Sequence, residues 1–82
     1  MEKTIHTEAY RDLIAWLKSC RERKGISMRE LAVQLNVSHS WVAKVEQNER
    51  RLDLLEYVRL CNSLGVNPST GLTKIKSALK DK

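Results

Sequence analysis

The small and polar side chains best placed to do chemistry lie in one row between residues 40 and 47. On a helix at 100° per residue, this row consists of Ser40, Ala43, Lys44 and Gln47. Val42 and Val45 point to the opposite side. A row of hydrogen-bond donors on one helix face suits the base edges in the major groove of DNA. A solvated polar face, which any soluble helix has, is the alternative interpretation.

Several residues beside this row could support nucleic-acid binding. His39 and Trp41 flank the row, and Arg50 and Arg51 follow it. Trp41 could pack on a sugar or a thymine methyl group, or it could cover the junction with the next helix. Arginines suit phosphate contacts, so we expect Arg50 and Arg51 to hold phosphates. A charge pair with Glu49 is the alternative for this loop.

Residues that could serve catalysis or metal binding lack the necessary arrangement. The sequence has no glycine-rich phosphate loop and no nucleophile elbow. His6 and His39 have no metal-ligand spacing to each other or to the cysteines. Cys20 and Cys61 each fall on the apolar side of a predicted helix, which favours two buried thiols over a disulfide. We therefore expect no enzyme, no cofactor, no metal and no small-molecule ligand.

Composition places the chain among small intracellular globular proteins. Its 82 residues suffice for one domain with one modest core. No apolar run reaches the roughly 18 residues that a membrane span needs, and the N-terminus does not resemble a secretion signal. We expect a cytoplasmic, nucleoid-associated protein. The net charge of +5 suits a polyanionic partner, but a solvated basic surface would look the same.

The elements that must position these side chains are predicted to be helices, because apolar residues recur with helical spacing and no segment alternates like a strand. The first helix ends at Gly25, and its apolar stripe comprises Tyr10, Leu13, Ile14, Leu17 and Cys20. The second helix starts at a capping box of Ser27 and Glu30. Its inner face comprises Met28, Leu31, Ala32 and Leu35.

The third helix is capped by Ser38 and runs to about Gln47. The fourth starts at a second capping box, Asp53 and Glu56, and Gly65 ends it. We expect the fourth helix to bury Leu54, Tyr57, Val58, Cys61 and Leu64.

Asn67 and Pro68 begin the last helix, in which the apolar residues are Leu72, Ile75 and Leu79. The prediction is an all-α fold, a compact five-helix bundle that forms a single domain over residues 1–82.

The join between the second and third helices allows only a tight turn. Asn36 tolerates the left-handed backbone that such a turn needs, and Ala32 is small enough for two helices to cross closely. The required apolar residues are present at Leu31, Leu35, Val37, Val42 and Val45. This pattern predicts a helix-turn-helix.

Residues 21–68 resemble the lambda-repressor-like family, the phage Cro and repressor type of helix-turn-helix domain. The resemblance rests on "GISMRELAVQLNVSHSWVAKVEQNERRLDLLEYVRLCNSLGVNP". Asn36 stands where members usually carry glycine, and Met28 stands where they often carry a phosphate-binding glutamine. In this chain the anchor must come from backbone N–H groups at the helix start or from Arg29. The resemblance also implies an ion pair between Arg21 and Glu46.

Together, the residues and the resemblance imply a set of site residues. The base-reading residues are His39, Ser40 and Lys44. Residues at the DNA backbone or its flank are Ser27, Met28, Arg29, Ser38, Trp41, Ala43, Gln47, Arg50 and Arg51. The family generally binds DNA as a dimer through its C-terminal helices, so the candidates for dimer contacts are Leu55, Leu72, Ile75 and Leu79, with residues 69–82 as the dimer element.

The resulting hypothesis is a sequence-specific regulator of transcription, a repressor, that reads double-stranded DNA as a homodimer. An antitoxin or a restriction–modification controller would use the same domain. A protein-docking helical module is the alternative from a different class, and salt-insensitive binding to a protein, with none to DNA, would favour it.

Overall fold

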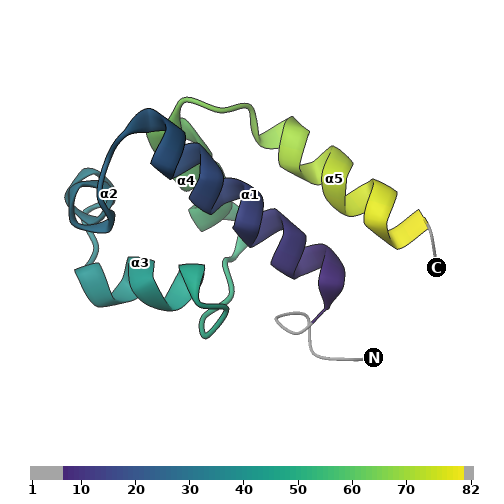
Figure 1. Cartoon of the computed structure of the whole chain (residues 1–82), viewed down its shortest axis with the longest axis horizontal. Helices are drawn as coiled ribbons and strands as arrows, with labels where there is room; N and C mark the ends of the chain where they lie inside the picture. Colours follow the sequence, from purple (N-terminus) through teal and green to yellow (C-terminus); the bar gives the residue numbers. More distant parts are fainter. Residues whose placement is uncertain (1–6, 81–82) are drawn as a thin grey trace.

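The computed structural model describes residues 7–80, and five helices account for most of this range (Figure 1). They are α1 (Glu8–Lys24), α2 (Met28–Leu35), α3 (His39–Glu46), α4 (Leu54–Leu64) and α5 (Pro68–Lys80). No strand occurs in this part of the chain. The predicted all-α, five-helix fold is therefore confirmed.

The helices begin where the capping residues predicted. Ser27 and Asp53 each form a complete capping box, with Glu30 and Glu56 respectively. The hydroxyl oxygen of Ser38 accepts a hydrogen bond from the Trp41 backbone N–H at 3.0 Å and so caps α3. Each cap satisfies a backbone donor that has no partner within the helix, which fixes the first residue of the helix.

The first four helices end in the same way. A residue with positive φ lies within two positions of each helix end, and these residues are Gly25, Asn36, Asn48 and Gly65. In every case its N–H and that of the next residue bond back to carbonyls of the last turn, as in the Schellman motif. The φ angles of the four residues lie between 57° and 77°, and the positive φ of Asn48 was not predicted. These closures make the connections short and set the direction of each following helix.

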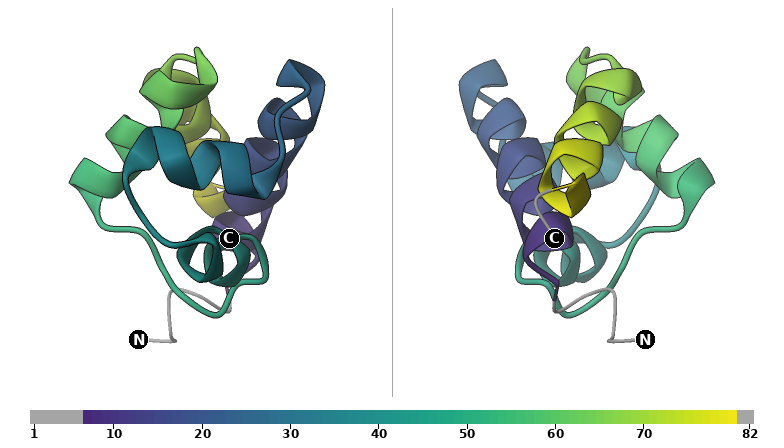
Figure 2. Two further views of the ribbon diagram at one scale, coloured as in Figure 1. Left: turned by 90° about the vertical axis from the view of Figure 1, so that its left-hand side faces the viewer. Right: turned by 90° about the vertical axis from the view of Figure 1, so that its right-hand side faces the viewer.

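The packing of the helices places α3 at the periphery of the molecule. The antiparallel pair α1 and α5 lies side by side along the length of the molecule (Figure 1). Helices α2 and α3 run in clearly different directions: α2 is seen end-on where α3 is seen along its length, and the left view of Figure 2 shows the reverse. Helix α3 lies at one edge of the molecule, so one of its sides faces away from the bundle.

The core confirms most of the predicted apolar stripes. All five stripe residues of α1 are buried, as are Leu31, Ala32, Val42 and Val45. In α4 the prediction was partly wrong, because Leu54 and Val58 are 74% and 37% exposed. The buried stripe is instead Tyr57, Leu60, Cys61 and Leu64. Since α4 is apolar on two sides, the helices packed against it decide which side is buried.

Helix α5 approaches α1 closely at Gly71, which is buried. A Cβ atom at this position would lie 2.8 Å from Leu13 Cδ1 and 2.9 Å from Trp16 Cζ3. The Tyr57 hydroxyl donates a hydrogen bond to the Pro68 carbonyl and so ties α4 to the start of α5. Only a residue without a side chain fits between these helices.

The cysteines are buried free thiols, as predicted. Burial is the main cause that raises the pKa of the Cys61 thiol, so the thiol stays protonated and packs as a small apolar group. Within residues 7–80 no cluster of potential metal ligands occurs, and His6 lies outside the described residues. No helix in that range has the length and apolar character to cross a membrane.

Candidate nucleic-acid interface

An ion pair between α1 and α3 holds the exposed helix in place. Arg21 Nε lies 2.7 Å from Glu46 Oε2, and a second bond joins Arg21 Nη2 to Glu46 Oε1 at 3.1 Å. Arg21 also donates to the Ile26 carbonyl at 2.9 Å. The bond with Glu46 is the main cause that raises the pKa of Arg21. The predicted pair is thus present, and it joins α1, the α1–α2 connection and the last residue of α3.

The polar row of α3 faces solvent. Ser40, Lys44 and Gln47 are exposed and Ala43 is half-buried, while Val42 and Val45 on the opposite side are buried. His39 is exposed at the first position of the helix. The structure therefore brings the predicted base-reading residues His39, Ser40 and Lys44 onto one accessible helix. Whether they contact bases stays a prediction.

The residues predicted to lie at the DNA backbone near the starts of α2 and α3 differ in how their side chains are placed. The hydroxyl oxygens of Ser27 and Ser38 accept hydrogen bonds from backbone N–H groups in their own helices. Met28 is half-buried and packs against the core, so its side chain faces the protein interior. Arg29 is exposed. The backbone N–H groups in the first turn of α2 and the Arg29 guanidinium are thus the groups here that suit a phosphate.

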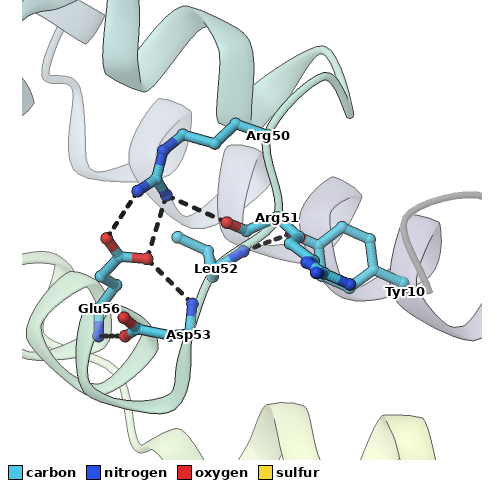
Figure 3. Close-up of polar contacts among 6 residues, drawn as sticks. All are labelled: Tyr10, Arg50, Arg51, Leu52, Asp53 and Glu56. Atoms are coloured by element: carbon cyan, nitrogen blue, oxygen red, sulfur yellow. Dashed lines mark hydrogen bonds and ion pairs between the residues drawn. The ribbon is translucent and has the colours of Figure 1, made fainter. Parts of the chain in front are cut away.

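Arg50 does not form the charge pair with Glu49 that was the alternative for this loop. Its two terminal nitrogens bond to the two carboxylate oxygens of Glu56, both at 3.0 Å, and one of them also bonds to the Arg51 carbonyl (Figure 3). The hydrogen bond from Arg50 is the main cause that lowers the pKa of Glu56. Arg50 is therefore paired within the protein, and its carboxylate partner is Glu56 instead of Glu49.

Trp41 covers the junction between α3 and α4, which was one of its two predicted roles. The Arg50 guanidinium lies over its ring, 5.1 Å from the ring centre. Trp41 is half-buried and lines a hollow of about 90 Å³ together with Leu35, Val37 and α4. One face of the indole ring is thus in contact with the protein itself.

Arg51 differs from its neighbour. Its side chain is exposed, and it makes no hydrogen bond or ion pair within residues 7–80. The next residue, Leu52, donates its backbone N–H to the Tyr10 hydroxyl at 3.0 Å, which ties the loop to α1 (Figure 3). Burial is the main cause that raises the pKa of Tyr10, so this hydroxyl stays neutral. Arg51 therefore stands as a free cation on an anchored loop.

Three residues of this region were missed as contributors. Glu56 was recognised only as a cap, Tyr10 only as a core residue, and Asn48 not at all. Asparagine before a loop is a signal for positive φ that could have identified Asn48. The second roles of Glu56 and Tyr10 depend on the path of the loop, for which the sequence carries no local signal.

Two helices joined by the connection 36–38, with α3 exposed along its polar row, define a helix-turn-helix protein. A family model described as a helix-turn-helix domain matches residues 12–70. Because this match covers most of the chain, the chain belongs to the helix-turn-helix domain family.

Solved structures of two kinds of protein illustrate a similarity that extends over nearly the whole chain. An XRE-family-like protein from Pseudomonas syringae pv. tomato str. DC3000 is 38% identical, with a TM-score of 0.81 and a match that covers 90% of each chain. The clp gene regulator ClgR from Corynebacterium glutamicum is 25% identical, with a TM-score of 0.75, and the match covers 89% of this chain and 95% of that one. No curated protein sequence matched the chain significantly.

Proposed function

We propose that this protein is a sequence-specific DNA-binding regulator of transcription of the lambda-repressor-like type. The observation that carries the proposal is the polar row of α3, which is exposed on a helix held by the Arg21–Glu46 pair. A helix presented in this way suits the major groove. The similarity to ClgR, which is named a gene regulator, supports a regulatory role.

The base-reading role falls to His39, Ser40 and Lys44. Lys44 is exposed in the middle of the row, and its ammonium group suits the O6 and N7 acceptors of guanine. Ser40 lies one turn earlier, and Ala43 and Gln47 complete the face.

Phosphate contacts on the two sides of α3 come from different elements. The first turn of α2, with Arg29, lies before the turn, and Arg51 lies in the loop after α3. Arg29 and Arg51 are both exposed, so each can reach a phosphate without first breaking an internal ion pair. Ser27 and Ser38 support this surface indirectly, because they cap the helices that carry it.

We further propose that the protein binds as a two-fold dimer with recognition helices about 34 Å apart, the rise of one DNA turn. Leu55, Leu72 and Leu79 are exposed on α4 and α5, whereas Ile75 is half-buried against the core and contributes less. The exposed residues Leu54 and Val58 enlarge the apolar surface of α4 beyond the predicted set. Apolar side chains exposed in this number suit an interface. A dimer bound across an operator excludes other proteins, so we propose repression as the outcome.

Selection of bound fragments from random double-stranded DNA, followed by footprinting, tests this function. We expect an operator with two related half-sites and a protected region that spans both. Footprinting of the protein on a single half-site, with a monomer in solution, would contradict the dimer. Failure to enrich any sequence, together with salt-insensitive binding to a protein, would favour the docking module instead.

A further inference from the structure

Arg50 joins the end of α3 to the start of α4. Its backbone N–H bonds to the Lys44 carbonyl in the last turn of α3 at 3.2 Å. Its side chain bonds to Glu56 in α4 through two N–H groups, and the guanidinium lies over the Trp41 ring. One residue of the loop is thus attached to both helices and to an aromatic side chain of α3.

Glu56, the partner of Arg50, is itself held in place by the capping box of α4. Its Oε1 atom accepts a hydrogen bond from the Asp53 backbone N–H at 2.9 Å, which is the reciprocal half of the α4 capping box (Figure 3). The carboxylate is therefore held at the start of α4 by a bond that does not involve Arg50. A glutamine would keep the cap, since capping boxes accept either residue, but it would lose the charge that holds Arg50.

The Trp41 ring also contacts Arg50. The ring lines a small hollow together with Leu35, Val37 and two charged residues of α4, and the Arg50 guanidinium lies over the ring. Trp41 follows Ser40 directly and precedes Lys44 by less than one turn. A change in the ring's position would therefore disturb the polar row itself.

We propose that Arg50 is a positioning residue: held by Glu56, it fixes the Trp41 ring and the α3–α4 loop for DNA binding and leaves the phosphate contact of this loop to Arg51. The proposal rests on the proposed function, because the positioned surface is the one that binds DNA. It assigns opposite roles to two adjacent arginines, one tied to the protein and one free.

Substitution of Glu56 by glutamine separates this role from a direct phosphate contact. If Arg50 held a phosphate on DNA, Glu56→Gln would release Arg50 and remove a negative charge, so affinity for all DNA would rise. If Arg50 positions Trp41, Glu56→Gln loosens the ring and lowers affinity for the operator. The two alternatives differ in the sign of the effect.

The experiment measures affinity for the selected operator and for random DNA over a range of salt concentrations. We expect Arg50→Gln and Glu56→Gln each to weaken operator binding by about two- to tenfold, the equivalent of one cation–π contact. The double variant should be no weaker than the weaker single variant, since both changes break the same contact. Arg51→Gln, the matched neutralisation one residue away, should lower the salt slope by about 0.9 per subunit, whereas Arg50→Gln should leave it unchanged.

Trp41 emission provides a readout that needs no DNA. In a Trp16→Phe background Trp41 is the remaining tryptophan, because the sequence has two. Arg50→Gln and Glu56→Gln should both make it more accessible to acrylamide quenching, and Arg51→Gln should not. Unchanged quenching in both variants, or tighter DNA binding by Glu56→Gln, would overturn the proposal.

Failure of the proposed function and failure of the proposed role of Arg50 would give different results. If the parent protein selects no DNA sequence, the proposed function fails and this role of Arg50 in DNA binding fails with it. If the parent selects an operator but Arg50→Gln lowers the salt slope as much as Arg51→Gln does, the function stands and Arg50 is a phosphate contact.

Discussion

Two arginine–glutamate pairs lie near the C-terminal end of α3, and they differ mainly in burial. The side chains of Arg21 and Glu46 are 10% and 11% exposed, whereas those of Arg50 and Glu56 are 38% and 26% exposed. Both pairs have two hydrogen bonds between guanidinium and carboxylate. Because water can replace a partner only in the exposed pair, the first should govern folding stability and the second should govern local placement.

The largest effect is expected from breaking the buried pair. Glu46→Ala should lower the free energy of unfolding by about 3 kcal/mol, because it leaves the Arg21 guanidinium buried without its charge partner. Chemical denaturation measures this change. Glu49→Ala is the matched control on an exposed glutamate three residues later, and it should stay within about 0.5 kcal/mol of the parent. Equal unfolding midpoints for Glu46→Ala and the parent would show that the buried pair contributes nothing.

The exposed pair should matter much less for stability. Glu56→Gln keeps the α4 cap and removes only the ion pair with Arg50, so we expect a loss of at most about 1 kcal/mol in the free energy of unfolding. The same denaturation experiment measures it. A loss as large as that of Glu46→Ala would remove the distinction between the two pairs.

The Glu56 carboxylate should contribute to the pH dependence of the free energy of unfolding. Its pKa is lowered in the folded protein, chiefly by the bond from Arg50. The pair therefore stabilises the fold fully above the pKa that Glu56 has in the unfolded chain, and this contribution is lost as the pH falls through the lower pKa of the folded state. Between neutral and acidic pH, Glu56→Gln should lose less stability than the parent. Parallel pH profiles would contradict this linkage.

The smallest effect is expected at Asn48, on the stretch of chain between the two pairs. Asn48 has a φ of 61°, and its buried Oδ1 atom has no hydrogen-bond partner within residues 7–80. Asn48→Gly should raise the free energy of unfolding by a few tenths to about 1 kcal/mol, because glycine removes both penalties. Thermal melting measures the gain. A decrease would mean that the asparagine side chain supports the loop between the pairs.

The two pairs also mark the limit of what the sequence predicts. Helix starts at Ser27, Ser38 and Asp53 were predictable because each depends on residues within one turn. The Arg21–Glu46 pair was predictable only through the family resemblance, since its members are 25 residues apart. The Arg50–Glu56 pair was missed because Glu56 already had a local role as a cap.

Helix α4 and the C-terminal part show the same limit in packing. Leu54 and Val58 continue a plausible apolar stripe, but the position of the neighbouring helices selects Leu60 for the core instead. The close approach of α5 to α1 at Gly71 could likewise not be predicted from the sequence, because it depends on where these two helices meet. Local signals thus predicted the helices and their ends, whereas contacts between distant segments required the structure.

The most direct test of the central proposal, that α3 reads base sequence, compares Lys44→Ala with Arg51→Ala on the selected operator and on random DNA. Lys44→Ala should cost about 1–3 kcal/mol of binding free energy on the operator, little on random DNA, and relax preference at one position of each half-site. Arg51→Ala should weaken binding to both DNAs similarly. Equal weakening of both DNAs by Lys44→Ala would show that Lys44 contacts the backbone and that the polar row does not read bases.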